Sequence, residues 1–193
     1  MIKRLIFILL VCAVSAQGGT FGNTSWTGTS QLNIEDACLG GWWDCDSNGY
    51  ADTMHVRVLF TGADKKCHAA IYRDSSGTYV MVDTSEVLTV SNSVSEQDLA
   101  FEMQQLNALV KDTRYALVVA AENDGGVDIG RAYYHTPSTN DTLWKRTSGA
   151  IFGVWPSTLT NFSVWIANYS VEIYCVYTAS EATKPQVIII NND

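Results

Sequence analysis

The residues whose types and spacing match a metal-binding loop lie between Asp44 and Asp52. The segment reads D-x-D-x-N-G-x-x-D, so side-chain oxygens recur at alternate positions and a glycine follows the third of them. Such oxygens wrap a hard cation, and the glycine allows the sharp turn that wrapping requires. The spacing therefore predicts a calcium site. Its expected ligands are Asp44, Asp46, Asn48, the backbone carbonyl of Tyr50, and Asp52, which binds directly or through water.

This loop resembles the calcium loops of EF-hands, dockerins and thrombospondin type 3 repeats. The pattern departs from all of them at the twelfth position, where this chain has His55 in place of an acidic ligand. Flanking helices are not evident either. The alternative interpretation is a polar turn, in which Asp or Asn side chains bond to nearby backbone groups.

Cysteines and tryptophans lie close to the same loop. Four cysteines remain after removal of a signal peptide, and an even number in an exported chain favours two disulfides. We expect the pairs Cys38–Cys45 and Cys67–Cys175; the alternative is free thiols that pack as small apolar groups. Trp42 and Trp43 are the first candidates for stacking on a sugar ring, unless they fill the core.

Residues 1–16 have the form of a secretory signal peptide. Lys3 and Arg4 precede an apolar run, Leu5 to Val14, that is too short to span a bilayer. Small residues then mark a cleavage site, which predicts a mature chain beginning at Gln17. We therefore expect a protein that is secreted or held at the cell surface, without membrane insertion.

The charge balance narrows the choice of partners. The chain has 12 basic and 20 acidic residues; removal of Lys3 and Arg4 leaves 10 basic residues and a net charge of −10. This excess of negative charge argues against binding to nucleic acid or to anionic membranes. Charged residues make up only 17 % of the chain, and aromatic residues 11 %, which is typical of an extracellular β protein.

Alternation of apolar and polar residues predicts a series of short strands. Met54–Phe60 alternates strictly, whereas Tyr115–Ala121 is a continuous apolar run of the kind found in buried strands. Ser95–Val110 fits both a helical and a strand period, and we favour a strand at Leu99–Met103. The other predicted strands are 67–72, 79–82, 87–90, 130–134, 143–145, 162–166 and 171–178.

The order of the segments HAAIYRDSSG, TSEVLTV, LVKDTRYALVVAAE, FGVWPS and YSVEIYCVYTA, across Val56–Ala179, resembles a jelly-roll module of bacterial and phage extracellular surface proteins. The resemblance implies a carbohydrate-binding or adhesion domain. We expect an all-β fold: a jelly-roll or immunoglobulin-like antiparallel β-sandwich with extended N- and C-terminal arms. The expected divisions are the signal peptide 1–16, an N-terminal arm 17–39, the sandwich 40–179 with its calcium loop at 44–52, and a linker with a C-terminal strand at 180–193.

The strand at the C-terminus consists of Val187, Ile188, Ile189 and Ile190 and follows a polar linker. Its two faces are both apolar, so it requires burial between neighbouring strands. It is either the last strand of its own sandwich or a donor strand that completes the sheet of a neighbouring copy. The second arrangement joins subunits head to tail and propagates into a filament.

Motifs for catalysis are missing: the chain has no nucleophile elbow, HExxH motif, Walker loop or dinucleotide glycine motif. His55, His68 and His135 have no metal-ligand spacing. We therefore expect a non-enzymatic structural or adhesive protein that assembles with copies of itself through terminal strand exchange. The alternative is a calcium-stabilised module that binds surface glycans. Glycosylation sequons occur at Asn23, Asn140, Asn161 and Asn168.

Overall fold

The computed structural model describes residues 18–35, 37–92, 95–123, 129–135, 142–145, 152, 155–160, 163–167 and 169–180. These residues form fifteen β-strands, and no helix long and apolar enough to cross a membrane occurs among them. The predicted signal peptide and the terminal strand Val187–Ile190 lie outside the described residues.

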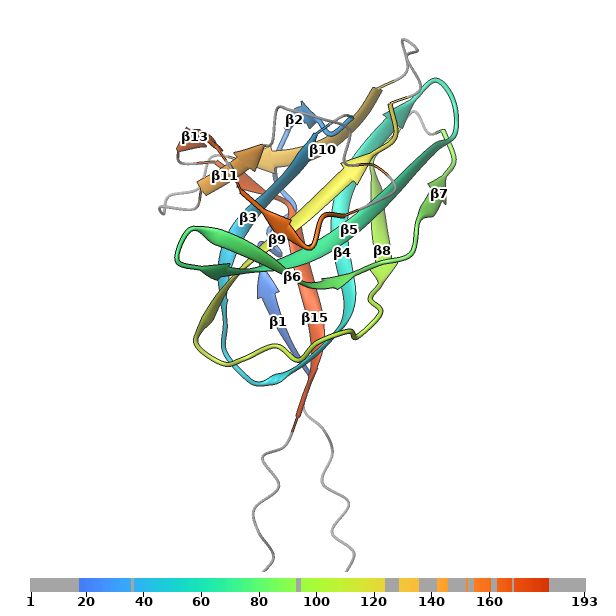
Figure 1. Cartoon of the computed structure of the whole chain (residues 1–193). Helices are drawn as coiled ribbons and strands as arrows, with labels where there is room; N and C mark the ends of the chain where they lie inside the picture. Colours follow the sequence, from blue (N-terminus) through green and yellow to red (C-terminus); the bar gives the residue numbers. More distant parts are fainter. Residues whose placement is uncertain are drawn as a thin grey trace, which may run out of the picture.

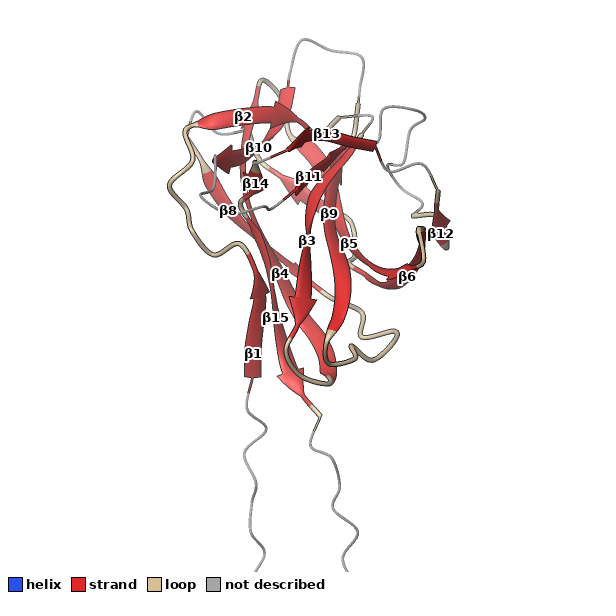
Figure 2. Cartoon of the chain, turned by 90° about the vertical axis from the view of Figure 1, so that its left-hand side faces the viewer, coloured by secondary structure: helices blue, strands red, loops and turns tan. Residues whose placement is uncertain are grey.

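The strands form two sheets that pack face to face (Figures 1 and 2). The seven-stranded sheet has the order β1 (Gly18–Gly22), β15 (Ile173–Ala179), β4 (Gly49–Thr61), β10 (Ile129–His135) and β14 (Ser170–Val171), with β2 (Ser30–Asn33) paired to β10 and β8 (Gln97–Glu102) paired to β4. The eight-stranded sheet has the order β12 (Thr158–Leu159), β6 (Thr78–Thr84), β5 (Lys65–Ser75), β9 (Thr113–Ala121), β3 (Cys38–Cys45), β11 (Thr142–Lys145) and β13 (Ser163–Ala167), with β7 (Leu88–Val90) paired to β5. The pairings between these strands are antiparallel, which confirms the predicted all-β sandwich.

The main core fills the space between the sheets, and strand alternation explains how it forms. In β4, Met54, Val56 and Val58 are fully buried and belong to this core. A second apolar cluster covers the outer face of the eight-stranded sheet and includes Tyr72 and Trp155. That sheet is therefore buried on both faces, which explains the continuous apolar run of β9.

The segment predicted as an N-terminal arm, 17–39, forms part of the sandwich in its described residues. β1 pairs with β15 from Gly18 to Gly22, β2 pairs with β10, and Ile34 is fully buried. These segments have weak strand patterning, so their order comes from the long-range partners that receive them. The expected arm is thereby corrected to two edge strands and their connection.

A buried ion pair holds the connection between β1 and β2 against the outer face of the seven-stranded sheet. Arg57 Nη1 donates to Glu172 Oε2 at 2.8 Å and to the carbonyl oxygen of Gly28 at 3.1 Å. The backbone N–H of Gly28 donates to Glu172 Oε1, and the guanidinium lies 4.3 Å from the centre of the Tyr133 ring. One buried pair thus fixes both backbone groups of Gly28.

The ambiguous segment 95–110 contains a strand and no helix. β8 runs from Gln97 to Glu102 and pairs with β4 from Thr53 to Val58. Leu99 and Phe101 are buried, whereas Ala100 and Glu102 between and beside them are exposed. The prediction of a strand near Leu99–Met103 is confirmed.

Candidate binding site

The predicted calcium ligands lie along the segment that connects β3 of the eight-stranded sheet to β4 of the seven-stranded sheet, and their oxygens contact different neighbours. Asp44 Oδ1 lies 3.4 Å from Arg114 Nε, and Asp46 accepts a hydrogen bond from the Tyr177 hydroxyl. The remaining contacts are Asn48 Oδ1 with the Lys111 N–H at 2.8 Å, and Asp52 with Gln105 Nε2 at 2.8 Å and Thr178 Oγ1 at 2.6 Å. Asp44 lies in β3 of one sheet and Asp52 in β4 of the other, so the predicted ligands are distributed along a connection between the two sheets.

Among the described residues, no group of three or more His, Cys, Asp or Glu side chains is placed to hold a metal ion. Tyr50, the fifth predicted ligand, lies in β4 opposite Thr178 of β15, and its side chain is exposed. This connection therefore has the contacts of a polar turn, and calcium binding stays a prediction of the sequence.

Neither expected disulfide is present. Cys38 and Cys45 are the first and last residues of the eight-residue strand β3, so about 23 Å separates their Cα atoms at ~3.3 Å per residue. A disulfide requires a Cα separation of about 4.4–6.8 Å, which excludes this pair. Cys67 and Cys175 lie in β5 and β15, on different sheets, and both are buried free thiols.

Trp42 and Trp43 do not form a joint platform. They are consecutive in β3 and therefore project to opposite faces of the sheet. Trp42 packs on the outer cluster, with its ring centre 4.6 Å from that of Tyr79, whereas Trp43 packs against the core between the sheets. Trp42 and Trp43 therefore cannot stack on the same sugar, although they are adjacent in the sequence.

One of the four sequons lies in the described residues. Asn23 Nδ2 donates to the carbonyl oxygen of Val171 at 3.1 Å and lies 3.4 Å from His135 Nδ1. A glycan attached to this nitrogen would replace one of its two hydrogens, so at most one of the two hydrogen bonds could remain. Asn140, Asn161 and Asn168 lie outside the described residues.

A cavity of about 230 Å³ lies on the outer face of the eight-stranded sheet, and we call it the tryptophan cavity. His68 of β5 and Trp155 contribute aromatic rings to it, stacked with their centres 4.5 Å apart and an angle of 25° between their planes. The cavity is lined by His68, Met81, Thr84, Ser85, Glu86, Val87, Gln104 and Trp155.

The residues that follow Trp155 bind to β5 and β6, and these contacts hold Trp155 over β5. The Tyr72 hydroxyl donates to the carbonyl oxygen of Pro156 at 2.8 Å, and β12 pairs with β6 immediately afterwards. The Met81 N–H also donates to the carbonyl oxygen of Ser157 at 2.9 Å. The chain thus brings Trp155 to His68 through strand pairing that local patterning does not encode.

Two ring nitrogens beside the tryptophan cavity have no hydrogen-bond partner. His68 is only 2 % exposed and Trp155 only 8 %, yet His68 Nε2 and Trp155 Nε1 are both unpaired. Burial lowers the pKa of His68 to about 4, so its ring is neutral near pH 7. A buried polar atom without a partner costs about 1–3 kcal/mol. Both nitrogens are shielded from solvent, so a ligand pairs with them only when one of the two rings shifts.

Hydrogen bonds fix the polar side chains of the cavity, Glu86 and Gln104. Glu86 Oε1 accepts from Gln104 Nε2 at 2.6 Å, and the Gln104 N–H donates to the Thr84 carbonyl oxygen at 3.0 Å. Next to them, the fully buried carboxylate of Asp83 accepts from the backbone N–H groups of Thr84 and Gln105 at 2.8 and 3.0 Å. Burial raises the pKa of Asp83, and these N–H donors oppose the rise. The polar rim is therefore built before any ligand arrives.

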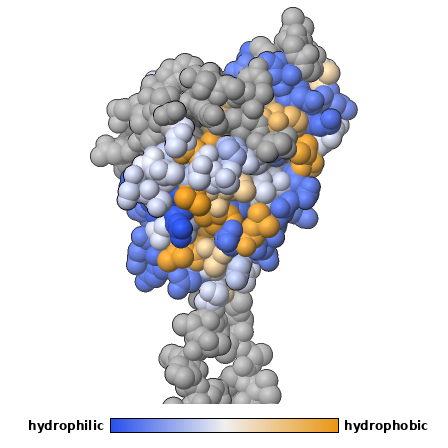
Figure 3. Space-filling model, viewed as in Figure 1, coloured by the Kyte–Doolittle hydropathy of each residue, from blue (hydrophilic) through white to orange (hydrophobic). Residues whose placement is uncertain are grey.

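The surface around the cavity combines apolar and polar groups. Figure 3 views the face of the eight-stranded sheet and shows apolar atoms gathered below the grey segments. Val87, which lines the cavity, is 43 % exposed. An apolar floor with a few fixed polar groups is the usual composition of a small-molecule site.

Sequence patterning missed this site. Strand alternation places His68 opposite to Cys67 and Ala69, but nothing in the sequence shows that Trp155 covers it. Glu86 and Gln104 carry no motif. The site combines one residue of β5, two of β6 and three of the segment before β7 with one residue each from the segments after β8 and before β12.

No family model and no curated protein matches the sequence. Solved structures do match: a Clostridial cysteine protease, Cwp84, after propeptide cleavage aligns with a TM-score of 0.61 and 13 % identity over 84 % of this chain. The cysteine protease and lectin-like domains of Cwp84, a surface layer associated protein of Clostridium difficile, align with a TM-score of 0.58 and 13 % identity over 86 % of this chain. The chain spans 40 % and 37 % of those two chains.

These comparisons correct the expectation that the protein is not an enzyme. Both neighbours are chains of a cysteine protease, so the missing motifs do not place this fold outside enzymes. At 13 % identity the likeness concerns the fold and does not identify catalytic residues. The chain therefore has the fold of an all-β sandwich that also occurs within a surface-associated bacterial protein.

Proposed function

We propose that this protein is a cell-surface domain that binds carbohydrate in the tryptophan cavity. The observation that carries the proposal is the pair of buried, unpaired nitrogens, His68 Nε2 and Trp155 Nε1, on stacked aromatic rings. Sugars have apolar ring faces that stack on aromatic side chains and hydroxyls that pair with such nitrogens. A structural neighbour that contains a lectin-like domain supports the same class of ligand.

The polar rim also suits a sugar. Glu86 and Gln104 offer acceptor and donor groups at fixed positions, and the uncharged His68 ring avoids the cost of burying a cation. At about 230 Å³, the cavity is below the about 300–1,000 Å³ of pockets for drug-sized ligands. Its size therefore favours one sugar unit.

A glycan array followed by calorimetry tests the proposal. His68→Phe keeps an aromatic ring for stacking and removes the nitrogen, so we expect about fivefold weaker binding or a larger loss, equivalent to ~1 kcal/mol. His55→Phe is the matched control, because His55 stacks on Tyr174 on the other sheet. No binding to any glycan, or equal binding by the wild type and His68→Phe, would contradict the proposal.

We infer a second function, self-assembly through the strand Val187–Ile190, from the sequence and from one feature of the fold. β1 is the last strand at its end of the seven-stranded sheet, and no described strand pairs with its outer side. Gly18 of β1 lies opposite Thr178 of β15, so the described chain begins and ends on neighbouring strands. An open edge of this kind can accept a strand from another copy.

Deletion of residues 186–193 tests assembly independently of sugar binding. If the terminal strand joins copies, electron microscopy of the full-length protein shows filaments that the deletion abolishes. Monomers in both samples would contradict strand exchange and leave the carbohydrate proposal unaffected.

A further inference from the structure

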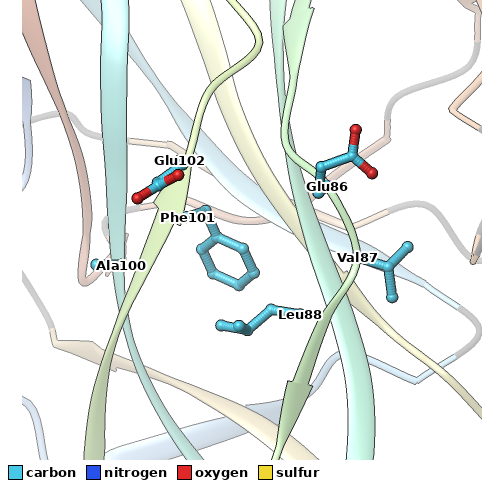
Figure 4. Close-up of a pocket in the computed structure, with 6 residues that line it drawn as sticks. All are labelled: Glu86, Val87, Leu88, Ala100, Phe101 and Glu102. Carbon is cyan, nitrogen blue, oxygen red and sulfur yellow. The ribbon is translucent and has the colours of Figure 1, made fainter.

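A second cavity lies at the edge of the sandwich, between β7 of one sheet and β8 of the other (Figure 4). This edge cavity has a volume of about 250 Å³ and is lined by Glu86, Val87, Leu88, Ala100, Phe101 and Glu102. In Figure 4, Phe101 and Leu88 point into the space between the two strands, and the carboxylates of Glu86 and Glu102 lie at one end of it. The edge cavity thus has an apolar floor and acceptor groups at its rim.

The two cavities share a wall. Glu86 and Val87 line both of them, and they belong to the segment that connects β6 to β7. Figure 4 shows Leu88 directed into the edge cavity and Val87 directed away from it. Only this segment separates the two cavities, so one ligand can contact both by crossing Glu86 and Val87.

Both cavities combine apolar side chains with polar groups, and the edge cavity is the more apolar of the two. Trp155 and His68 form the floor of one cavity, and Phe101 and Leu88 form the floor of the other. Each rim carries the Glu86 carboxylate, to which the edge cavity adds Glu102. A ligand that matches two similar neighbouring sites is itself a repeating chain of apolar rings with hydroxyl groups.

We propose that the tryptophan and edge cavities are adjacent subsites for one linear oligosaccharide, which crosses the wall formed by Glu86 and Val87. The inference rests on the proposed carbohydrate-binding function and adds that the ligand is a chain of at least two units. The tryptophan cavity holds one unit by stacking and by its unpaired nitrogens. The edge cavity holds the next unit on Phe101 and Leu88, with hydroxyls donating to Glu102.

Calorimetry against oligomers of glucose and of N-acetylglucosamine, from one to six units, tests this. We expect wild-type affinity to rise about tenfold between one unit and the short oligomers, then to level off. Glu102→Ala and Leu88→Ala should reduce that rise to less than threefold and leave single-unit binding unchanged. Asp44→Ala is the matched control, because this exposed carboxylate lines neither cavity.

The outcomes separate this inference from the function on which it rests. A wild-type protein that binds single units without any gain from longer oligomers would overturn the two-subsite inference alone. A gain that persists in Glu102→Ala would overturn it as well, because Glu102 is exposed and its replacement leaves the core intact. Absence of binding at every length, together with no binding to any glycan on the array, would overturn both the inference and the carbohydrate-binding function.

Discussion

Replacement of Arg57 by Met should destabilise the sandwich strongly, although the side chain has a similar length. Arg57 is 9 % exposed, and Glu172 beneath it is fully buried. Burial lowers the pKa of Arg57, but its bonds to Glu172 and Glu96 and the charges of both carboxylates together raise it above the ordinary value. The substitution therefore leaves the buried Glu172 carboxylate without the cation that it contacts.

The expected cost follows from the lost contacts. In the variant, the Glu172 carboxylate keeps its hydrogen bond from the Gly28 N–H. The other nearby group, His135 Nδ1, lies 3.9 Å from Glu172 Oε1, which is too far for a hydrogen bond. Removing one partner of a buried ion pair costs about 3–5 kcal/mol. The free energy of unfolding of a domain is about 5–15 kcal/mol, so the variant should lose a large part of its stability. The connection between β1 and β2 should detach first, because Arg57 and Glu172 hold Gly28.

Urea denaturation of the wild type, Arg57→Met and Arg114→Met provides the measurement. Arg114 is the control because its pair with Asp44 is exposed and is worth about 0–1 kcal/mol. Adding Glu172→Gln to Arg57→Met removes the unpaired charge and keeps an oxygen for the Gly28 N–H, so it should recover more than half of the loss. If Arg57→Met costs no more than Arg114→Met, the argument from the buried charge is wrong.

Three further predictions concern pH, thiols and calcium. Burial lowers the folded-state pKa of His68 to about 4, below the ~6.5 of an unfolded chain. The free energy of unfolding should therefore fall by about 3 kcal/mol as the pH drops from 6.5 to 4. In urea titrations at each pH, His68→Phe should remove that part of the pH dependence. Burial raises the pKa of Cys67 to about 12 and also raises the pKa of Cys175. A disulfide-exchange reagent should therefore label these two thiols only after the protein unfolds. Rapid labelling of the native protein would refute this prediction. If the segment 44–52 binds calcium, free calcium at 100 times the dissociation constant should add about 2.7 kcal/mol to the free energy of unfolding and raise Tm relative to chelator, whereas an unchanged Tm means that the segment is a polar turn.

The strands of the body were predictable because their signal is local. Alternation in Met54–Phe60 and the apolar run Tyr115–Ala121 fall within β4 and β9. The edge strands β1 and β2 escaped prediction, because glycine-rich or polar segments become strands only when a neighbouring strand supplies their hydrogen bonds. The buried pair of Arg57 and Glu172 spans 115 residues of sequence and left no pattern to read.

The calcium loop and the cysteines show the limit of spacing as evidence. Asp44 to Asp52 has the order of a metal-binding loop, but its strands direct the oxygens to Arg114, Tyr177 and other partners. The proximity of Cys38 and Cys45 in sequence becomes a large separation along one extended strand. A spacing motif predicts a site only if the chain adopts the backbone conformation that the motif requires.

The sequence by itself predicted an all-β sandwich and body strands such as β4 and β9, because the apolar pattern of these strands is local to their own residues. Tertiary structure decided where the candidate chemistry lies. It stacked Trp155 on His68, set the β6–β7 connection between two cavities, and dispersed the acidic side chains of the predicted loop. The physical reason is that sheet pairing joins residues far apart in the chain, whereas alternation records only which face each residue occupies.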